Sequence, residues 1–251
     1  MTPRVTSGAN ALFGGCATAA ALVAASQLTD QPAFWVGVHF GKLAAAGSTV
    51  EVRGRVLGAG RTLTHLSVEA TAAGAEVFSA RITAGRRSSS TVEGHWSPVP
   101  DVAGPEESEP FDLPVHDGTW AERFEWRLAA GRGSSGGPVA SWWVRPKGER
   151  PDPLVTLAVV ADYVTYGVGR ALGSPMGGLS VDNSLRIHRR ELSEWLLLAV
   201  RPEAVADGLG FGSAYVYDSE RRLLAVGGQT MVVNDWDWRT PAERYAEAGE
   251  G

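Results

Sequence analysis

One ionisable side chain, Asp162, lies inside an otherwise apolar stretch of the sequence. Residues 154–161 read LVTLAVVA and the chain continues with DYVTYGVG, a pattern typical of a helix that is apolar on all sides and therefore buried. An unpartnered carboxylate is costly to bury, so Asp162 must be protonated, well hydrogen-bonded or functional. It is a candidate for general acid–base chemistry, and bonding to a nearby hydroxyl such as that of Thr165 is the structural alternative.

Composition narrows the possible classes of protein. The chain has 251 residues and is 44% hydrophobic, which is enough for one large domain or two small ones. Its net charge of -5 argues against a partner among nucleic acids or anionic membranes, because both attract basic surfaces. A single cysteine, Cys16, excludes a disulfide framework and a thiolate metal site, so we expect no metal and no other cofactor.

Targeting signals are also weak. The apolar run 11–25 resembles a secretory signal superficially, but Gly14 and Gly15 interrupt it. No other run reaches the roughly 20 apolar residues that cross a bilayer. We therefore expect a cytoplasmic protein with no membrane-spanning segment.

Secondary-structure patterns fall into two groups. The first group comprises an Ala/Leu-rich helix over 17–28 and strands over 34–40, 49–57, 63–71 and 76–83. The second comprises strands over 120–128 and 139–144, the helix from Leu154, and strands over 180–188, 195–200, 212–217 and 223–233. Residues 86–118 are rich in proline and acidic residues, which predicts an extended linker.

These groups predict a domain over 1–85, a linker over 86–118, a second domain over 119–235 and a tail over 236–251. The same order of helix and strands recurs in both domains, and the interval from Phe40 to Ile82 nearly equals that from His188 to Gln229. We infer an internal duplication. In the tail, Trp236 and Trp238 could cover a sheet edge or form an oligomer contact.

Six short segments carry a resemblance that spans about Asn10 to Val233. In order they read LFGGCATAAAL, GRTLTHLSVEA, DPLVTLAVVADY, LSVDNSLRIHR, EWLLLAVRPEAVADGLGFGSAYVYD and LLAVGGQTMVV. Together they resemble the acyl-CoA thioesterase II (TesB-like) family. The resemblance implies an α+β double hot-dog fold, in which each half is an antiparallel sheet wrapped around a long central helix and the halves pair like a dimer.

The resemblance also implies a catalytic trio of an aspartate, a threonine or serine, and a glutamine. The matching residues are Asp162 in VVADYV, Ser180 in GGLSVD and Gln229 in GGQTM. In such enzymes the trio holds a water for attack on the thioester carbonyl, with the aspartate as general base. The structural alternatives are a capping role for Ser180 and a buried backbone-satisfying amide for Gln229.

A thioester hydrolase also needs donors to the developing oxyanion. Gly14 and Gly15 open the first helix, where glycine lets a substrate carbonyl approach free backbone N–H groups. We therefore expect Gly14, Gly15 and Cys16 to bind the substrate. Near the counterpart positions the first half has Cys16 for Asp162 and Ile82 for Gln229, so we expect one active site per chain.

Further side chains could support this site. Strict strand alternation places Ser180, Asp182 and His188 on one face, so Asp182 and His188 are candidates for supporting contacts around the trio. Arg86 and Arg87, or Arg189 and Arg190, could meet the phosphates of coenzyme A. Paired arginines at a sheet edge are more often simply solvated.

Two other chemistries fit less well. Residues 133–137, GSSGG, satisfy the pattern G-x-S-x-G, but a nucleophile elbow requires a buried strand before it and a helix after it. A hot-dog dehydratase or hydratase requires a histidine paired with the acid. His39, His65 and His188 lie within the repeats, and none is on a central helix.

The sequence therefore predicts a hydrolase of acyl-CoA or a related acyl thioester that acts by direct water attack. The alternative is a catalytically silent acyl-CoA-binding or assembly protein on the same fold. By analogy with hot-dog families, we expect a homo-oligomer, either a dimer or a tetramer.

Overall fold

A computed structural model of the chain describes residues 5–7, 10–86, 92–113, 118–130, 140–172 and 178–233. The tail over 236–251, Arg87 and the segment 133–137 lie outside these residues. None of the described helices is long and apolar enough to span a membrane.

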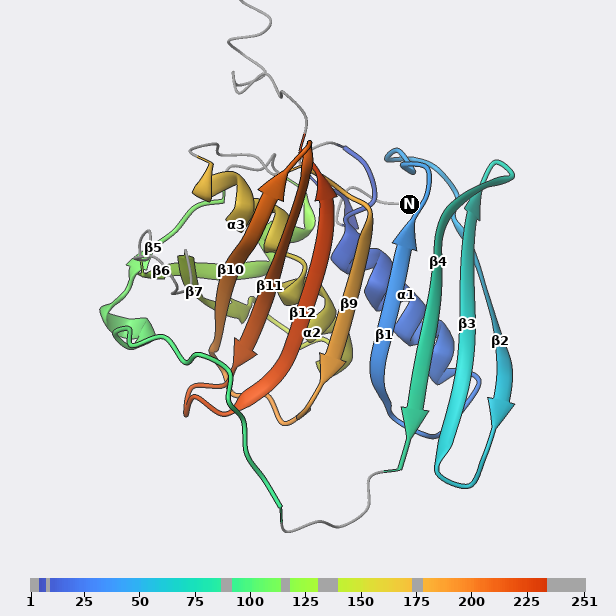
Figure 1. The fold of residues 1–251 in the computed structure, drawn as a ribbon, viewed down its shortest axis with the longest axis horizontal. Coiled ribbons are helices and arrows are strands. Elements are labelled where there is room, and N and C mark those ends of the chain that lie inside the picture. The colour runs from blue at the N-terminus through green and yellow to red at the C-terminus, as the bar shows by residue number, and fades with distance from the viewer. Residues whose placement is uncertain are drawn as a thin grey trace, which may run out of the picture.

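Twelve strands form one antiparallel sheet, and three α-helices lie on one face of it (Figure 1). The order across the sheet is β2-β3-β4-β1-β9-β12-β11-β10-β7-β6-β5, and β8 also pairs with β12. The strands are β1 (Ala33–Phe40), β2 (Glu51–Ala59), β3 (Leu63–Ala72), β4 (Ala75–Gly85), β5 (Glu109–Pro110), β6 (Phe124–Ala130), β7 (Ala140–Pro146), β8 (Leu179–Ser180), β9 (Asp182–Ile187), β10 (Leu196–Ala206), β11 (Leu209–Tyr217) and β12 (Leu223–Val232). The helices are α1 (Gly14–Ser26), α2 (Pro153–Ala161) and α3 (Val164–Ala171), with short 3-10 turns η2 (Pro105–Glu107) and η3 (Trp120–Arg123).

The predicted duplication and α+β fold class are confirmed by the order of the strands. The first half contributes β2-β3-β4-β1, and the second half repeats this arrangement as β10-β11-β12-β9. The halves join where β1 pairs antiparallel with β9, with Val36 opposite Leu185 and Val38 opposite Asn183. In the second half, β7, β6 and β5 extend the sheet beyond β10.

Small residues let the two central helices approach each other closely. Ala17, Ala21 and Leu22 of α1 are almost fully buried, and a Cβ at Gly15 would lie 2.9 Å from Val159 Cα of α2. Alanine also favours the helical backbone throughout α1. In α2, Asp152 caps the first turn by accepting a hydrogen bond from Leu154 N at 2.8 Å. The first turns of both helices are therefore fixed in position.

The predicted long helix from Leu154 is interrupted at Asp162. Helix α2 ends at Ala161 and α3 begins at Val164, while Asp162 has φ -84° and ψ 41°, outside the helical region. Aspartate is a weak helix former, and its side chain here finds hydrogen-bond partners on other elements. The prediction of one continuous helix is wrong at this residue.

Part of the segment 86–118, predicted as a linker, lies against the second half of the chain. Tyr217 donates its hydroxyl to Pro98 O at 2.8 Å, Trp143 Nε1 donates to Ala103 O at 2.9 Å, and Arg221 Nη2 donates to Val102 O at 2.7 Å. These contacts hold the segment against a second hydrophobic cluster that includes Trp143, Trp195 and Tyr217. Backbone carbonyls supply the binding groups, which a prediction from side-chain composition overlooks.

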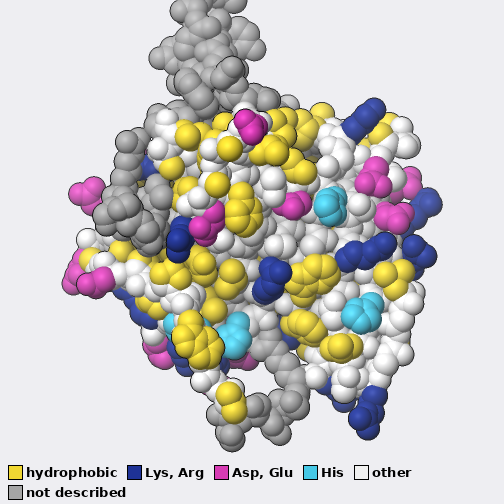
Figure 2. All heavy atoms as spheres, in the orientation of Figure 1, with side chains coloured by type: hydrophobic (Ala, Val, Ile, Leu, Met, Phe, Trp, Pro, Cys, Tyr) yellow, Lys and Arg dark blue, Asp and Glu magenta, His cyan; other side chains and the backbone are white. Residues whose placement is uncertain are grey.

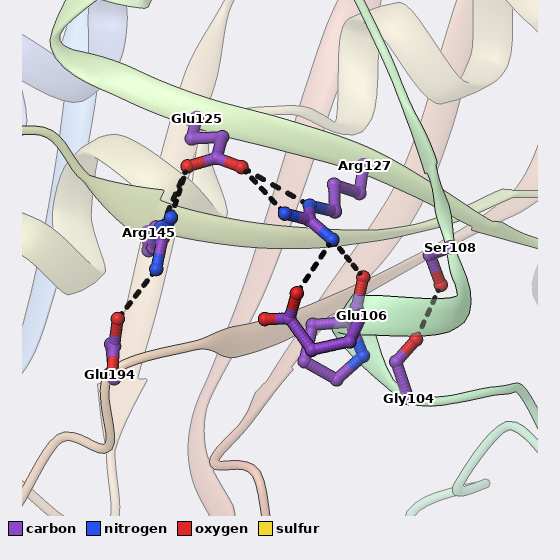
Figure 3. Close-up of polar contacts among 8 residues, drawn as sticks. Gly104, Glu106, Ser108, Glu125, Arg127, Arg145 and Glu194 are labelled. Atoms are coloured by element: carbon purple, nitrogen blue, oxygen red, sulfur yellow. Dashed lines mark hydrogen bonds and ion pairs between the residues drawn. The ribbon is translucent and has the colours of Figure 1, made fainter.

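A network of ion pairs and hydrogen bonds connects Pro105 and Glu106 of this segment to Arg127 of β6 (Figure 3). Glu125 pairs with Arg145 at 2.7 Å and with Arg127 at 3.1 Å, and Arg127 Nη1 also donates to Pro105 O at 2.7 Å. Burial opposes ionisation of Glu125, but the hydrogen bonds from Arg145 and Arg127 outweigh it and lower the pKa of this carboxyl. Both guanidinium groups lie over the Trp195 ring.

On the outer face of the sheet, Lys and Arg side chains lie among acidic, histidine and hydrophobic ones (Figure 2). Leu209 and Phe211 of β11 are about half exposed there. This face therefore carries charges of both signs.

The Glu125 network predicts a measurable contribution to stability. We expect Glu125→Ala to lower the free energy of unfolding by about 1 kcal/mol, because it leaves Arg127 and Arg145 without their shared carboxylate. Glu51→Ala is the matched control, since Glu51 forms an ion pair with Arg53 that is highly exposed. Urea titration of both variants measures the difference. Equal stability of the two variants would show that the network contributes nothing.

Candidate functional site

Polar side chains from three elements meet at Asp162, at the break between α2 and α3. Gln229 Nε2 of β12 donates hydrogen bonds to Asp162 Oδ1 at 2.6 Å and to Ser180 Oγ of β8 at 2.8 Å. Asn183 Nδ2 of β9 donates to the same Asp162 Oδ1 at 2.7 Å. Asp162, Asn183 and Gln229 are each at most 3% exposed. The structure thus brings together Asp162, Ser180 and Gln229 and adds Asn183, which the sequence analysis missed.

A β-bulge explains why Asn183 reaches the site. Ser180 lies opposite Met231 and Ser184 lies opposite Gly228, so the strand has one residue more than its partner between these pairs. Thr230 is the one residue opposite the bulge, and it bonds to both bulged residues. Val181 N donates to Thr230 O, and Thr230 N donates to Asp182 Oδ1 at 2.7 Å. The extra residue turns Ser180 and Asn183 toward the same side.

The bulge corrects the predicted strand face. Strict alternation placed Ser180, Asp182 and His188 together, whereas Asn183 points to Asp162 and its neighbour Asp182 therefore points to the opposite face. Asp182 fixes the backbone of Thr230, next to Gln229, rather than touching Asp162. His188 lies beyond the end of β9 and is exposed, with its backbone N–H bonded to Leu224 O.

The first turn of α1 closes another side of the site. Asp162 accepts a backbone hydrogen bond from Gly15. A Cβ at Gly14 would lie 2.7 Å from Asp162 Oδ2 and 3.1 Å from Phe40 Cζ, so this position has no room for a side chain. The two glycines thus place the positive end of the helix against the carboxylate. Substrate binding by Gly14, Gly15 and Cys16 stays a prediction.

Burial sets the protonation of the site. It raises the pKa of Asp162 to about 7, against the opposing hydrogen bonds from Gly15, Gln229 and Asn183. Near neutral pH a large fraction of Asp162 is therefore ionised and able to accept a proton. Burial, together with the charge of Asp162, raises the pKa of Cys16 to about 12, which keeps this thiol protonated.

Two polar groups of the site, the Ser180 hydroxyl and Gln229 Oε1, can each form one further hydrogen bond to a ligand. Ser180 Oγ accepts from Gln229, so the Ser180 hydroxyl proton remains to be donated. Gln229 Oε1 is buried and has no hydrogen-bond partner among the described residues. The orientation of the Gln229 amide follows from the carboxylate, which needs a donor at Oδ1. A water held here could receive one hydrogen bond and donate others to Gln229 Oε1 and Asp162.

Aromatic packing fixes the backbone on both sides of the site. Trp120 stacks on Phe13, which precedes Gly14, with ring centroids 4.2 Å apart. The same indole meets Tyr163, which follows Asp162, edge-on at 5.8 Å, and Trp126 stacks on Tyr163 at 4.8 Å. The aromatic side chains of η3 and β6 therefore fix the start of α1 and the break between α2 and α3 relative to each other.

The described arginines predicted to contact the phosphates of coenzyme A include Arg86 and Arg189, and the structure places Arg86 away from Asp162. Phe40, at the site end of β1, pairs with Phe78 of β4, whereas Ala33 at the other end pairs with Ala84. Arg86 follows the latter end, most of a strand length away from Asp162. Arg189 instead pairs with Glu93 at 2.7 Å.

Within the described part of the first half, the position matched to Gln229 lacks a polar side chain. Ile82, the counterpart predicted for Gln229, is apolar and 1% exposed. Among the described residues, no group of three or more His, Cys, Asp or Glu side chains could hold a metal ion.

Both halves of the chain match known domain families. Residues 2–85 match the acyl-CoA thioesterase N-terminal domain, and residues 99–233 match the acyl-CoA thioesterase C-terminal domain. No curated protein matches the chain.

Solved structures are similar over most of the chain. A candidate thioesterase from Novosphingobium aromaticivorans DSM 12444 is 31% identical, with 93% of each chain covered and a TM-score of 0.86. A tesB protein from Mycobacterium avium subs paratuberculosis is 22% identical, with 90% of this chain and 88% of that chain covered and a TM-score of 0.73. Acyl-CoA thioesterase II TesB2 from Mycobacterium marinum is 18% identical, with 91% and 92% covered and a TM-score of 0.66. The last two show the fold alone.

Cys16 offers a test of the electrostatics of the site. Because its pKa is raised to about 12, we expect the folded protein to react with iodoacetamide at pH 8 about a thousandfold more slowly than the unfolded chain. Mass spectrometry of the alkylated protein measures both rates. Equal rates would contradict the burial and charge described for Cys16.

Proposed function

This chain belongs to the acyl-CoA thioesterase family, and we propose that it hydrolyses acyl-CoA, or a related acyl thioester, by direct attack of water. One observation carries the proposal. Gln229 links Asp162 to Ser180 through two short hydrogen bonds, beside a helix start with glycines at its first two positions. A buried base, two water-orienting groups and backbone donors are what hydrolysis of an activated ester requires.

The chemistry follows from these contacts. Asp162 takes a proton from a water held by Ser180 and Gln229, while the water oxygen forms a bond to the thioester carbonyl carbon. The carbonyl electrons move to the oxygen, which is stabilised by backbone N–H groups at the start of α1 other than that of Gly15, since the Gly15 N–H already bonds Asp162. When the C–O double bond reforms, the C–S bond breaks, and the thiolate leaves and takes up the proton held by Asp162. The products are a free acid and a free thiol.

The mechanism needs no covalent enzyme intermediate. Burial and the nearby charge of Asp162 raise the pKa of Cys16. The Cys16 thiol therefore stays protonated and is a poor nucleophile. The trio lies on a single chain, so each chain would have one active site. A dimer or tetramer and a cytoplasmic location stay predictions.

Turnover of thioesters is the first prediction of this proposal. We expect thiol release from at least one member of a panel of short-chain, long-chain and aromatic acyl-CoAs and acyl carrier protein thioesters. Asp162→Asn and Gln229→Ala should each lower kcat/KM by about 10²- to 10⁴-fold, because they remove the base or the group that orients the water. Asp30→Asn, an exposed aspartate just beyond the opposite end of α1, is the matched control and should keep full activity.

A panel without turnover, combined with a thermal shift on binding acyl-CoA, would instead indicate the catalytically silent acyl-CoA-binding protein. Turnover that survives Asp162→Asn would leave the reaction class intact and reject Asp162 as the base.

The pH dependence of turnover is a second prediction. Because ionised Asp162 is the active form and its pKa is about 7, kcat/KM should rise about tenfold per pH unit below pH 7 and become level above it. Initial rates with one substrate between pH 5 and 9 measure this profile. A rate that is constant from pH 5 to 9, or that falls as the pH rises through 7, would contradict the assignment.

A further inference from the structure

We propose that Asn183 is a positioning residue that anchors Asp162 Oδ1 and so leaves Oδ2 as the oxygen that accepts the proton of the attacking water. The catalytic part of this inference rests on the proposed function. The contact itself, between two buried side chains on β9 and at the helix break, stands independently of it.

Two amide donors converge on one oxygen of the carboxylate. Asn183 Nδ2 lies 2.7 Å from Asp162 Oδ1 and Gln229 Nε2 lies 2.6 Å from the same atom. An oxygen that accepts two short hydrogen bonds is stabilised as an anion and is a poor acceptor for a further proton. The proton from water is therefore expected at the other oxygen.

Oδ2 faces the side where the substrate is expected. It is the atom that a Cβ at Gly14 would approach to 2.7 Å, so it lies against the first turn of α1. Glycine at this position lets the first turn of α1 lie directly against Oδ2. The proton acceptor and the backbone N–H groups at the helix start thus lie on the same side of the carboxylate.

Asp162 also accepts the backbone N–H of Gly15, so Gln229 and Asn183 are its two side-chain donors. The Gln229 Nε2 group is shared between Asp162 and Ser180, so any movement of Ser180 on substrate binding reaches Asp162 through the same amide. Asn183 adds a donor from a different strand, one whose side chain reaches the site only because of the bulge at Val181 and Asp182. With both donors in place, rotation of the carboxylate would break two short bonds.

Few titratable groups face Asp162 from the surrounding elements. Cys16 is on α1 and Tyr163 follows at the helix break, and the pKa of each is raised by burial. On β9, Asp182 and Arg186 point to the opposite face of the sheet from Asn183. On β12, the neighbours of Gln229 are uncharged. Loss of the Asn183 donor should therefore appear directly in the titration of Asp162.

The test compares Asn183→Ala and Asn183→Gln with Ser184→Ala. Ser184 is the next residue of β9, and its hydroxyl bonds Gly228 O instead of Asp162, so it is a matched control. Glutamine carries the same uncharged amide donor and adds no titratable group beside Asp162. Thermal unfolding confirms that each variant is folded.

Two readouts are measured for each folded variant. We expect Asn183→Ala to move the titration of the Asp162 carboxyl carbon, followed by ¹³C NMR, by about one pH unit or more to higher pH. The rise of kcat/KM at low pH should shift to higher pH by the same amount as the Asp162 titration. At pH 6, kcat should fall by a larger factor than KM changes. Asn183→Gln should recover most of both shifts, and Ser184→Ala should show neither.

A purely structural role for Asn183 gives a different outcome. It predicts a lower unfolding temperature with an unchanged Asp162 titration and an unchanged pH profile, and that result would overturn the inference. If the wild type hydrolyses no thioester, the proposed function fails, while the NMR titration still decides whether Asn183 holds Asp162.

Discussion

The structure depends on keeping one carboxylate, that of Asp162, away from water and still able to ionise. Burial alone favours the protonated acid, and donors from α1, β9 and β12 restore part of the stability of the anion. These opposing effects leave the pKa of Asp162 at about 7, in the range where a general base is most useful near neutral pH. The donors come from both halves of the duplicated fold, so the site requires the halves to be joined.

Several local irregularities serve this one group. The helix is interrupted at Asp162, the strand bulges at Val181 and Asp182, and Gly14 lets the start of α1 pack directly against Oδ2. Each would weaken a regular helix or strand considered alone. Trp120, which packs on both Phe13 and Tyr163, holds the two helix termini on which these irregularities depend. Such departures from regular structure are typical of functional sites.

Much of the arrangement follows from the sequence. Apolar periodicity located the helices and most strands, the repeated order indicated the duplication, and the lone carboxylate in an apolar helix marked Asp162. Ser180 and Gln229 came from the family resemblance, because a serine at a strand start and a glutamine in a hairpin carry no distinctive pattern. The contact of Asn183 with Asp162 could not be predicted from strand alternation. A single inserted residue reverses the side to which the following side chains point, and the alternation pattern does not show where such a residue is inserted. Composition predicts an extended linker over 86–118 and does not reveal that Pro98 and Val102 contact the second half, because their carbonyls rather than their side chains accept the hydrogen bonds.

Direct attack by water on the acyl carbon, with Asp162 only moving a proton, is the central claim. A single turnover of excess enzyme with an acyl-CoA substrate in ¹⁸O-labelled water, followed by mass spectrometry of the product and of the peptide that contains Asp162, tests it most directly. Direct attack by water places one ¹⁸O atom in the released acid and none in the Asp162 carboxyl. Unlabelled acid, or label in Asp162, would show that the carboxylate attacks the substrate itself, which rules out direct attack by water.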